Sequence, residues 1–133
     1  MKKGFTIIEV IVALTVFTIG VLGIEAYFAT SSRLTTAASR ISTASNLAQG
    51  IIDNEAASAY DALIPGTGAK VRVSTDPASP FYNYQQQIII SLIDNNLNAS
   101  ATDIGLKKIN VKVFWQEGGA EKNVEMSTIQ TNS

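Results

Sequence analysis

A single carboxylate, that of Glu9, lies within an otherwise uncharged apolar run over residues 5–24. Lys2 and Lys3 precede the run, and Glu25 follows it. An ionised group inside a hydrocarbon layer is costly, so a glutamate at such a position normally has a functional reason. The chemistry open to it there is ion pairing, because a nearby ammonium group offsets part of the cost of removing both charges from water.

The apolar run has the length of a membrane-spanning helix, since a bilayer core of about 30 Å requires about 20 apolar residues. The lysines before it predict a cytoplasmic N-terminus. Three other interpretations compete: a cleaved secretory signal, a plain signal anchor and a buried core helix. The first has only a weak cleavage site at residues 29–31, and the second leaves Glu9 unexplained. The third requires a larger protein than 133 residues to surround the helix.

The order Lys2-Lys3-Gly4, then Phe5-Thr6-Ile7-Ile8-Glu9 and the apolar run, resembles the class III signal of type IV pilins and pseudopilins. The resemblance implies that a prepilin peptidase cleaves between Gly4 and Phe5 and methylates the new amine of Phe5. Glu9 matches the position of that family's near-universal glutamate. The resemblance therefore implies a docking step in which the Phe5 amine of an incoming subunit pairs with Glu9 of a subunit already in the filament.

The helix that carries these residues is predicted to continue well beyond the apolar run. Apolar side chains recur every three or four residues, the spacing of an amphipathic helix, at Leu34, Ala37, Ala38, Ile41, Ala44, Leu47, Ala48, Ile51 and Ile52. No proline precedes Pro65, so the pattern predicts one helix over about residues 5–60. Gly20 and Gly23 each weaken it by roughly 1 kcal/mol relative to alanine. They either let the helix bend during assembly or allow close packing between helices.

After a turn at residues 65–68 the apolar period changes to two, which predicts strands. The strands are expected over residues 69–75, 82–93, 107–115 and 122–130, and a turn over residues 116–121 makes the last two a hairpin. The predicted fold is α+β, with a long N-terminal helical spine packed on a three- to four-stranded antiparallel sheet. Four aromatic residues are expected to pack in the core or on the sheet: Phe81, Tyr82, Tyr84 and Trp115.

The C-terminal strands and the Asn46-Leu47-Ala48-Gln49 segment resemble, with less specificity, small PilV-like minor pilins and the I-type pseudopilins of type II secretion. The resemblance implies a leader over residues 1–4, a hydrophobic helix over 5–28, its amphipathic continuation over 29–60 and a globular domain over 61–133. The chain has no Cys and no Pro in the apolar run, in contrast to many major pilins. Both absences favour a minor pilin or a pseudopilin.

Composition excludes several chemistries. The chain has no His and no Cys, which removes Ser-His-Asp and Cys-His catalysis, Cys/His zinc sites and disulfides. Asp53, Glu55 and Asp61 lack partners and are expected on a solvated face, so no enzyme is predicted. Asp94, Asn95, Asn96 and Asp103 offer oxygen ligands in a predicted loop, but they lack the EF-hand spacing. The sequence predicts neither a metal site nor a cofactor.

Charge does not favour nucleic acid as a partner, because 10 Lys and Arg balance 11 Asp and Glu. Four lysines of the predicted hairpin region can form a small basic patch for DNA: Lys107, Lys108, Lys112 and Lys122. Glutamates are interspersed among them, however, and a solvated face of mixed sign is the stronger interpretation.

The prediction for function is a structural subunit, most like a minor pilin, of a type IV pilus or pilin-like filament. The expected partners are other pilin or pseudopilin subunits, a prepilin peptidase, an inner-membrane assembly platform protein and, before assembly, membrane lipid. The chain is expected first in the cytoplasmic membrane and then in an extracellular pilus or a periplasmic pseudopilus. The alternatives are a pseudopilin of type II secretion or DNA uptake, and a membrane-anchored binding module that never polymerises.

Overall fold

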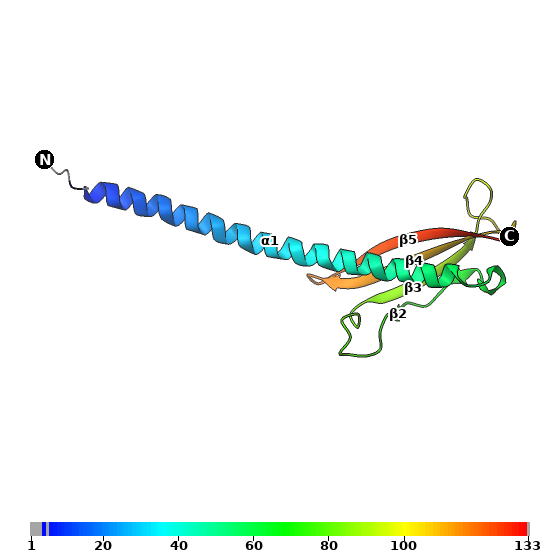
Figure 1. The fold of residues 1–133 in the computed structure, drawn as a ribbon. Coiled ribbons are helices and arrows are strands. Elements are labelled where there is room, and N and C mark those ends of the chain that lie inside the picture. Colours follow the sequence, from blue (N-terminus) through cyan, green and yellow to red (C-terminus); the bar gives the residue numbers. More distant parts are fainter. Residues whose placement is uncertain (1–3, 5, 133) are drawn as a thin grey trace. The chain divides into compact units, whose positions relative to one another are not determined.

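The computed structural model describes residue 4 and residues 6–132. The chain divides into two compact units, unit 1 with Met1–Ala38 and unit 2 with Ser39–Ser133. One long helix, α1 (Ile7–Ala56), contributes to both units (Figure 1). The predicted single helix is confirmed, and so is the α+β, pilin-like fold class.

The helix ends earlier than the sequence predicts. The amide of Ser58 donates to the carbonyl oxygen of Glu55 at 3.0 Å, three residues back rather than four, which tightens and closes the last turn. A short 3-10 helix, η1 (Tyr60–Ala62), follows. The prediction that α1 reaches Tyr60 is therefore wrong, because apolar spacing does not distinguish an α-helical turn from the tighter turn that ends it.

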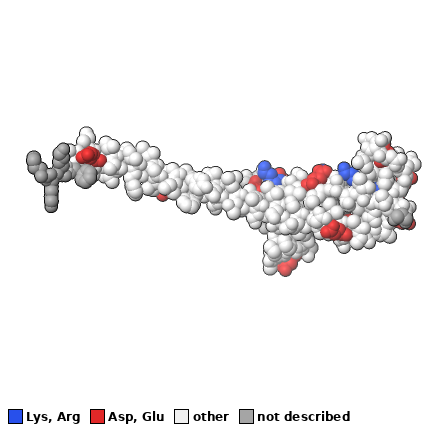
Figure 2. Space-filling model, turned by 45° about the horizontal axis from the view of Figure 1, so that its top comes forward, with Lys and Arg blue, Asp and Glu red and all other residues white. Residues whose placement is uncertain are grey.

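In unit 1, α1 is long and apolar enough to cross a membrane, by length and composition, and none of its most apolar stretch is buried. Figure 2 shows a mostly uncharged surface over this half of the helix. The helix runs through Gly20, Gly23 and Gly50 without interruption. A Cβ atom added at any of the three meets no neighbouring atom within 4 Å.

Unit 2 contains a five-stranded antiparallel sheet rather than the predicted three or four strands. The strands are β1 (Gly66–Thr67), β2 (Val71–Arg72), β3 (Gln85–Leu92), β4 (Leu106–Glu117) and β5 (Ala120–Thr131). Their order is β1-β3-β4-β5, and β2 also pairs with β3. The difference arises because residues 66–67, predicted as part of a turn, pair with Ile90 and Ile89.

The predicted hairpin is confirmed, with a shorter turn. Glu117 pairs with Ala120, so Gly118 and Gly119 alone form the loop. Their φ angles are 59° and 81°. Two successive positive φ angles define the type I′ turn, whose twist matches that of the flanking strands and which glycine adopts without strain.

The core of unit 2 lies between one face of the sheet and the last turns of α1. Ala44, Ala48 and Ile52 are its buried helix residues. Every second residue of β4 from Lys107 to Trp115 is buried, which confirms the predicted alternation. The two alanines carry no side chain beyond Cβ, so the helix can approach the sheet closely.

Among the four aromatic residues, the prediction for Phe81 is wrong. Phe81 is exposed, because it lies in a turn where its amide donates to the Ser79 hydroxyl at 3.2 Å, outside any strand. Ile93 is buried just beyond β3, where it pairs with Ala99. Leu34 and Ile41 are exposed, and the buried part of the helix face begins at Ala44. Tyr84 and Trp115 are buried as predicted, with ring centroids 6.4 Å apart, whereas Tyr82 is half-buried.

Candidate assembly site

The first turn of α1 is closed by reciprocal hydrogen bonds between Thr6 and Glu9. The Thr6 amide and the Thr6 hydroxyl each donate to Glu9 Oε2 at 3.1 Å. The Glu9 amide donates back to Thr6 Oγ1 at 3.3 Å. This arrangement is a capping box, in which a Thr at the N-cap and a Glu three residues later satisfy amide groups that the helix leaves unpaired.

The sequence prediction did not include this capping box, although the Thr-x-x-Glu spacing at the start of an apolar run is its known signature. The prediction gave Glu9 one role, the pairing of charge between subunits. The structure gives it a second role within its own helix. Only Oε2 takes part, and within residues 6–132 no group donates to Oε1.

Glu9 also borders an apolar surface. Together with Val10, Ala13, Leu14 and Phe17 it lines an open groove along one side of α1. All of these residues are exposed, so unit 1 presents a carboxylate at the end of an apolar stripe. Such a stripe can bury itself in lipid or against the apolar side of another helix.

The remaining predicted site residues are placed as follows. Gly4 lies before the helix and is exposed. Phe5, the predicted site of cleavage and methylation, lies outside the described residues. Gly20 and Gly23 lie within α1, away from Glu9 in sequence. Cleavage between Gly4 and Phe5, and methylation of Phe5, therefore stay predictions.

The carboxylates considered for catalysis do not gather into a site. Asp53 accepts a hydrogen bond from the Gln49 side chain at 2.8 Å, and Asp53 and Asp61 are exposed. Among residue 4 and residues 6–132, no group of three or more His, Cys, Asp or Glu side chains is arranged to hold a metal ion.

The loop oxygens considered for Ca²⁺ hold the loop itself. Asp94 Oδ1 accepts hydrogen bonds from the amides of Asn96 and Asn98, at 2.8 and 2.9 Å. Asp103 accepts hydrogen bonds from the Tyr60 hydroxyl and from the amide of Gly105. Through these hydrogen bonds, both carboxylates stabilise the conformation of the loop.

The lysines considered for a basic patch lie on both faces of the sheet. Alternation along β4 places Lys107 on the buried face, where only 5% of it is exposed, and Lys108 on the other face. Lys112 pairs with Glu125 at 3.2 Å. The solvated face of mixed sign that was expected for these lysines therefore does not include Lys107, because neighbouring residues of a strand point to opposite faces.

Lys107 instead joins a cluster that ties the loop before β4 to η1. Its Nζ donates to the carbonyl oxygen of Tyr60 at 2.9 Å and lies 4.0 Å from the centre of the Tyr60 ring. Burial, together with the hydrogen bond to Asp103, raises the pKa of Tyr60 to about 12. The same hydrogen bond, followed by that from the Gly105 amide, lowers the pKa of Asp103. The loop position is thus fixed by polar contacts of Asp103 with Tyr60 and Gly105, beside the buried bond from Lys107 to Tyr60.

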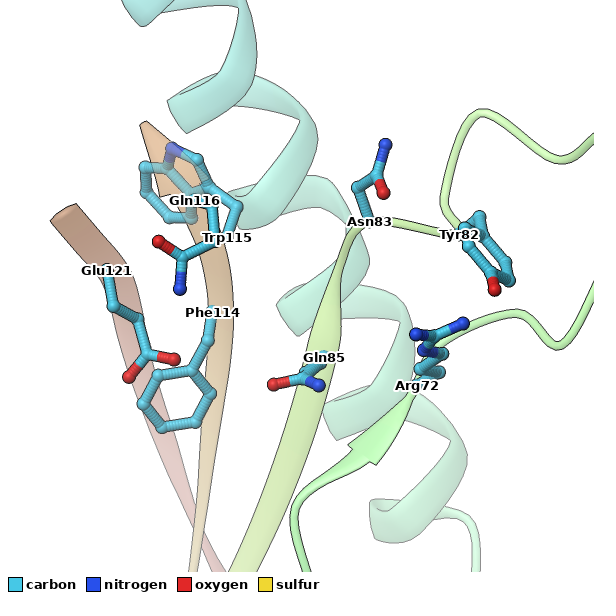
Figure 3. Close-up of a pocket in the computed structure, with 8 residues that line it drawn as sticks. All are labelled: Arg72, Tyr82, Asn83, Gln85, Phe114, Trp115, Gln116 and Glu121. Atoms are coloured by element: carbon cyan, nitrogen blue, oxygen red, sulfur yellow. The ribbon is translucent and has the colours of Figure 1, made fainter. Parts of the chain in front are cut away.

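A small polar cavity of about 180 Å³ opens in unit 2 near one end of the β4–β5 hairpin (Figure 3). Arg72, stacked 4.2 Å from the Tyr82 ring centre, lies on one side, and Glu121 lies on the other, with Gln85 between them. Lys70 pairs with Glu121 and lies 3.9 Å from the centre of the Phe114 ring. The cavity brings no nucleophile together with a base.

Comparison with known protein families gives a match at the N-terminal end of the chain. Residues 1–24 match the family described as the prokaryotic N-terminal methylation motif. The match covers the predicted cleavage junction, Glu9 and all of the apolar run. It supports a type IV pilin-like or pseudopilin chain that is a substrate of prepilin peptidase. Neither the curated proteins nor the solved structures provide a match.

Proposed function

We propose that this chain is a minor pilin, a structural subunit of a type IV pilus or a related filament. One observation carries the proposal. The methylation motif at residues 1–24 coincides with the start of an exposed apolar helix that has one carboxylate in its first turn. The motif and the fold indicate a structural subunit rather than an enzyme. The apolar helix and the motif together support membrane anchoring.

In this proposal, residues 1–4 are a leader, residues 5–28 a membrane and filament-core helix, residues 29–60 its amphipathic continuation and residues 61–133 a globular domain. Prepilin peptidase cleaves between Gly4 and Phe5 and methylates Phe5. In lipid, the apolar stripe of α1 contacts acyl chains. In the filament, it contacts the helices of neighbouring subunits, after an inner-membrane platform protein has brought the subunits together.

Docking rests on Glu9 in this proposal. An amine and a carboxylate are each costly in an apolar environment, and pairing offsets part of the cost. Because the capping box uses Oε2, the Phe5 amine of an incoming subunit can pair at Oε1 without breaking the bonds between Thr6 and Glu9. A subunit lacking this pair should insert in the membrane but fail to enter the filament.

Mass spectrometry of the mature protein tests the proposal directly. In cells that contain a prepilin peptidase, we expect a chain that begins with methylated Phe5. Deletion of the peptidase gene should return the full chain with its leader. An unmethylated N-terminus at any other residue, in cells with an active peptidase, would contradict the proposal.

The alternative of a pseudopilin shares all these residues and differs in the machine that it serves. Recovery of the protein in sheared surface filaments supports the minor pilin. Recovery only with a secretion or DNA-uptake apparatus supports the pseudopilin. Recovery in the inner membrane alone supports a binding module that does not polymerise.

A further inference from the structure

Unit 1 carries one acidic and one basic side chain beyond its apolar run. Between Val10 and Ala38, Glu25 and Arg33 are the only charged residues. Both side chains are exposed on α1, and neither joins an ion pair within residues 6–132. They lie eight residues apart, which separates them by about 12 Å along the helix axis and by about 80° around it. Ion pairs on one helix join residues three or four apart, so these two do not pair with each other.

The charged groups on either side of them already have partners in their own chain. Arg40 Nη1 donates to the carbonyl oxygen of Gln116 at 3.1 Å, within unit 2. At the other end of α1, Glu9 Oε2 accepts two hydrogen bonds from Thr6. Glu25 and Arg33 therefore remain as the complementary charges that α1 offers to another helix. Small side chains allow two helix backbones to approach closely, and several lie near this pair: Ala26, Ala29, Ser32, Thr36 and Ala37.

We propose that Glu25 of one copy of this chain pairs with Arg33 of a second copy, whose helix lies parallel and is shifted along the axis by eight residues, or about 12 Å. The inference rests on the proposed function, in which α1 contacts the helices of neighbouring subunits. A copy whose Glu25 is paired still presents its own Arg33 to a third copy. Such a head-to-tail contact does not close on itself, and it builds an open filament rather than a dimer.

The same spacing opposes this contact while both copies are in lipid. Two copies in a bilayer hold their apolar runs at equal depth, because a shift of about 12 Å would carry much of a run of about 30 Å out of the hydrocarbon. At equal depth Glu25 lies beside Glu25 and Arg33 beside Arg33, and like charges repel. The pair therefore favours helices that have left the membrane, and it delays association before that step.

The absence of native cysteines allows a test of the shift in the full chain. Ala29→Cys and Ala37→Cys lie about one turn beyond Glu25 and Arg33 and leave both charges in place. Two copies with different tags, one with each substitution, are produced in cells that assemble filaments, and sheared filaments and membranes are oxidised separately. A disulfide between the two tags reports a shift of eight residues, and a disulfide between copies with the same tag reports helices at equal depth.

We expect the mixed-tag dimer in filaments at roughly ten times the yield of either same-tag dimer, because a disulfide cannot join residues whose Cα atoms are more than about 7 Å apart. Membranes should show no excess of the mixed-tag dimer. Equal yields of mixed-tag and same-tag dimers in filaments would overturn the proposal. So would disulfides that join this chain only to other proteins.

Charge reversal checks that the ion pair is the cause. Arg33→Glu sets a second carboxylate opposite Glu25, and we expect the mixed-tag yield to fall by about fivefold. Glu25→Arg combined with Arg33→Glu restores the pair with its charges exchanged, and should return the yield to within about twofold of the starting chain. A double reversal that is no better than the single one refutes the pairing.

Incorporation is measured before oxidation, so that two failures stay distinct. A chain that never enters filaments contradicts the proposed function and this inference together. A chain that enters filaments but gives no mixed-tag dimer contradicts the inference alone.

Discussion

Two substitutions separate the capping role of Glu9 in its own helix from its proposed docking role between subunits. Glu9→Gln removes the charge but keeps a side chain that completes a capping box, since Gln serves as well as Glu at that position. Thr6→Ala removes the hydroxyl, and with it two of the three hydrogen bonds of the cap, but keeps the charge. Glu9→Gln therefore tests the charge with the cap kept, and Thr6→Ala tests the cap with the charge kept.

The expected magnitudes differ by more than an order of magnitude. Loss of an N-cap side chain typically costs about 1 kcal/mol, or about fivefold in an equilibrium constant. Removing one partner of a buried ion pair costs about 3–5 kcal/mol, or about 100-fold and more. If Glu9 pairs with the Phe5 amine of a neighbour, Glu9→Gln should nearly abolish filament incorporation, while Thr6→Ala should reduce it modestly.

The assay compares the amount of each variant in sheared filaments with the amount of cleaved protein in the membrane. Mass spectrometry first establishes that each variant has lost its leader, so that a processing defect is not counted as an assembly defect. Wild-type incorporation of Glu9→Gln would refute the docking role. A greater loss for Thr6→Ala than for Glu9→Gln would show that Glu9 acts through the cap alone.

Three further predictions concern the helix, the core and the alkaline pH range. Alanine at both Gly20 and Gly23 should leave membrane insertion unchanged, since a Cβ atom meets no neighbour there, but should lower incorporation into sheared filaments if assembly needs the glycines. Ala48→Leu should destabilise unit 2 by about 1–3 kcal/mol in urea unfolding, because the site is fully buried and overpacking forces the core apart. Tyr60 should titrate near pH 12 in folded protein, followed by phenolate absorbance, against about 10 when unfolded. Because the folded pKa is the higher one, its stabilising contribution is complete below pH 10 and is lost as pH rises toward 12, and Tyr60→Phe should remove that loss.

Sequence patterning predicted the parts of the fold that repeat. The long helix and the β4–β5 hairpin follow from spacings of three to four and of two over many residues, and burial on one face reinforces each. Strand β1 has two residues, too few for any period to appear, and β2 keeps only residues 71–72 of the strand predicted over residues 69–75. Their existence depends on β3, whose edge they cover, and that long-range contact has no local signal.

Prediction of individual side chains met the same limit, because local contrast is visible in the sequence and long-range contacts are not. Glu9 is conspicuous because its neighbours in residues 5–24 are uncharged and mostly apolar, and that contrast is visible in the sequence. Lys107 was misplaced for the opposite reason, since its charge predicted solvent. Its burial depends on the Tyr60 ring and carbonyl oxygen, 47 residues away in the chain.

The cap and the proposed docking role of Glu9 support each other rather than compete. An incoming amine finds its partner more readily when the carboxylate already holds one conformation, because less side-chain freedom is then lost on pairing. The bonds from Thr6 to Oε2 supply that restriction and leave Oε1 without a partner within residues 6–132. Cleavage between Gly4 and Phe5 leaves the Phe5–Thr6 peptide bond intact, so the Thr6 amide that donates to Glu9 survives processing. The same three bonds can therefore close the helix in the membrane and hold Glu9 ready for the next subunit.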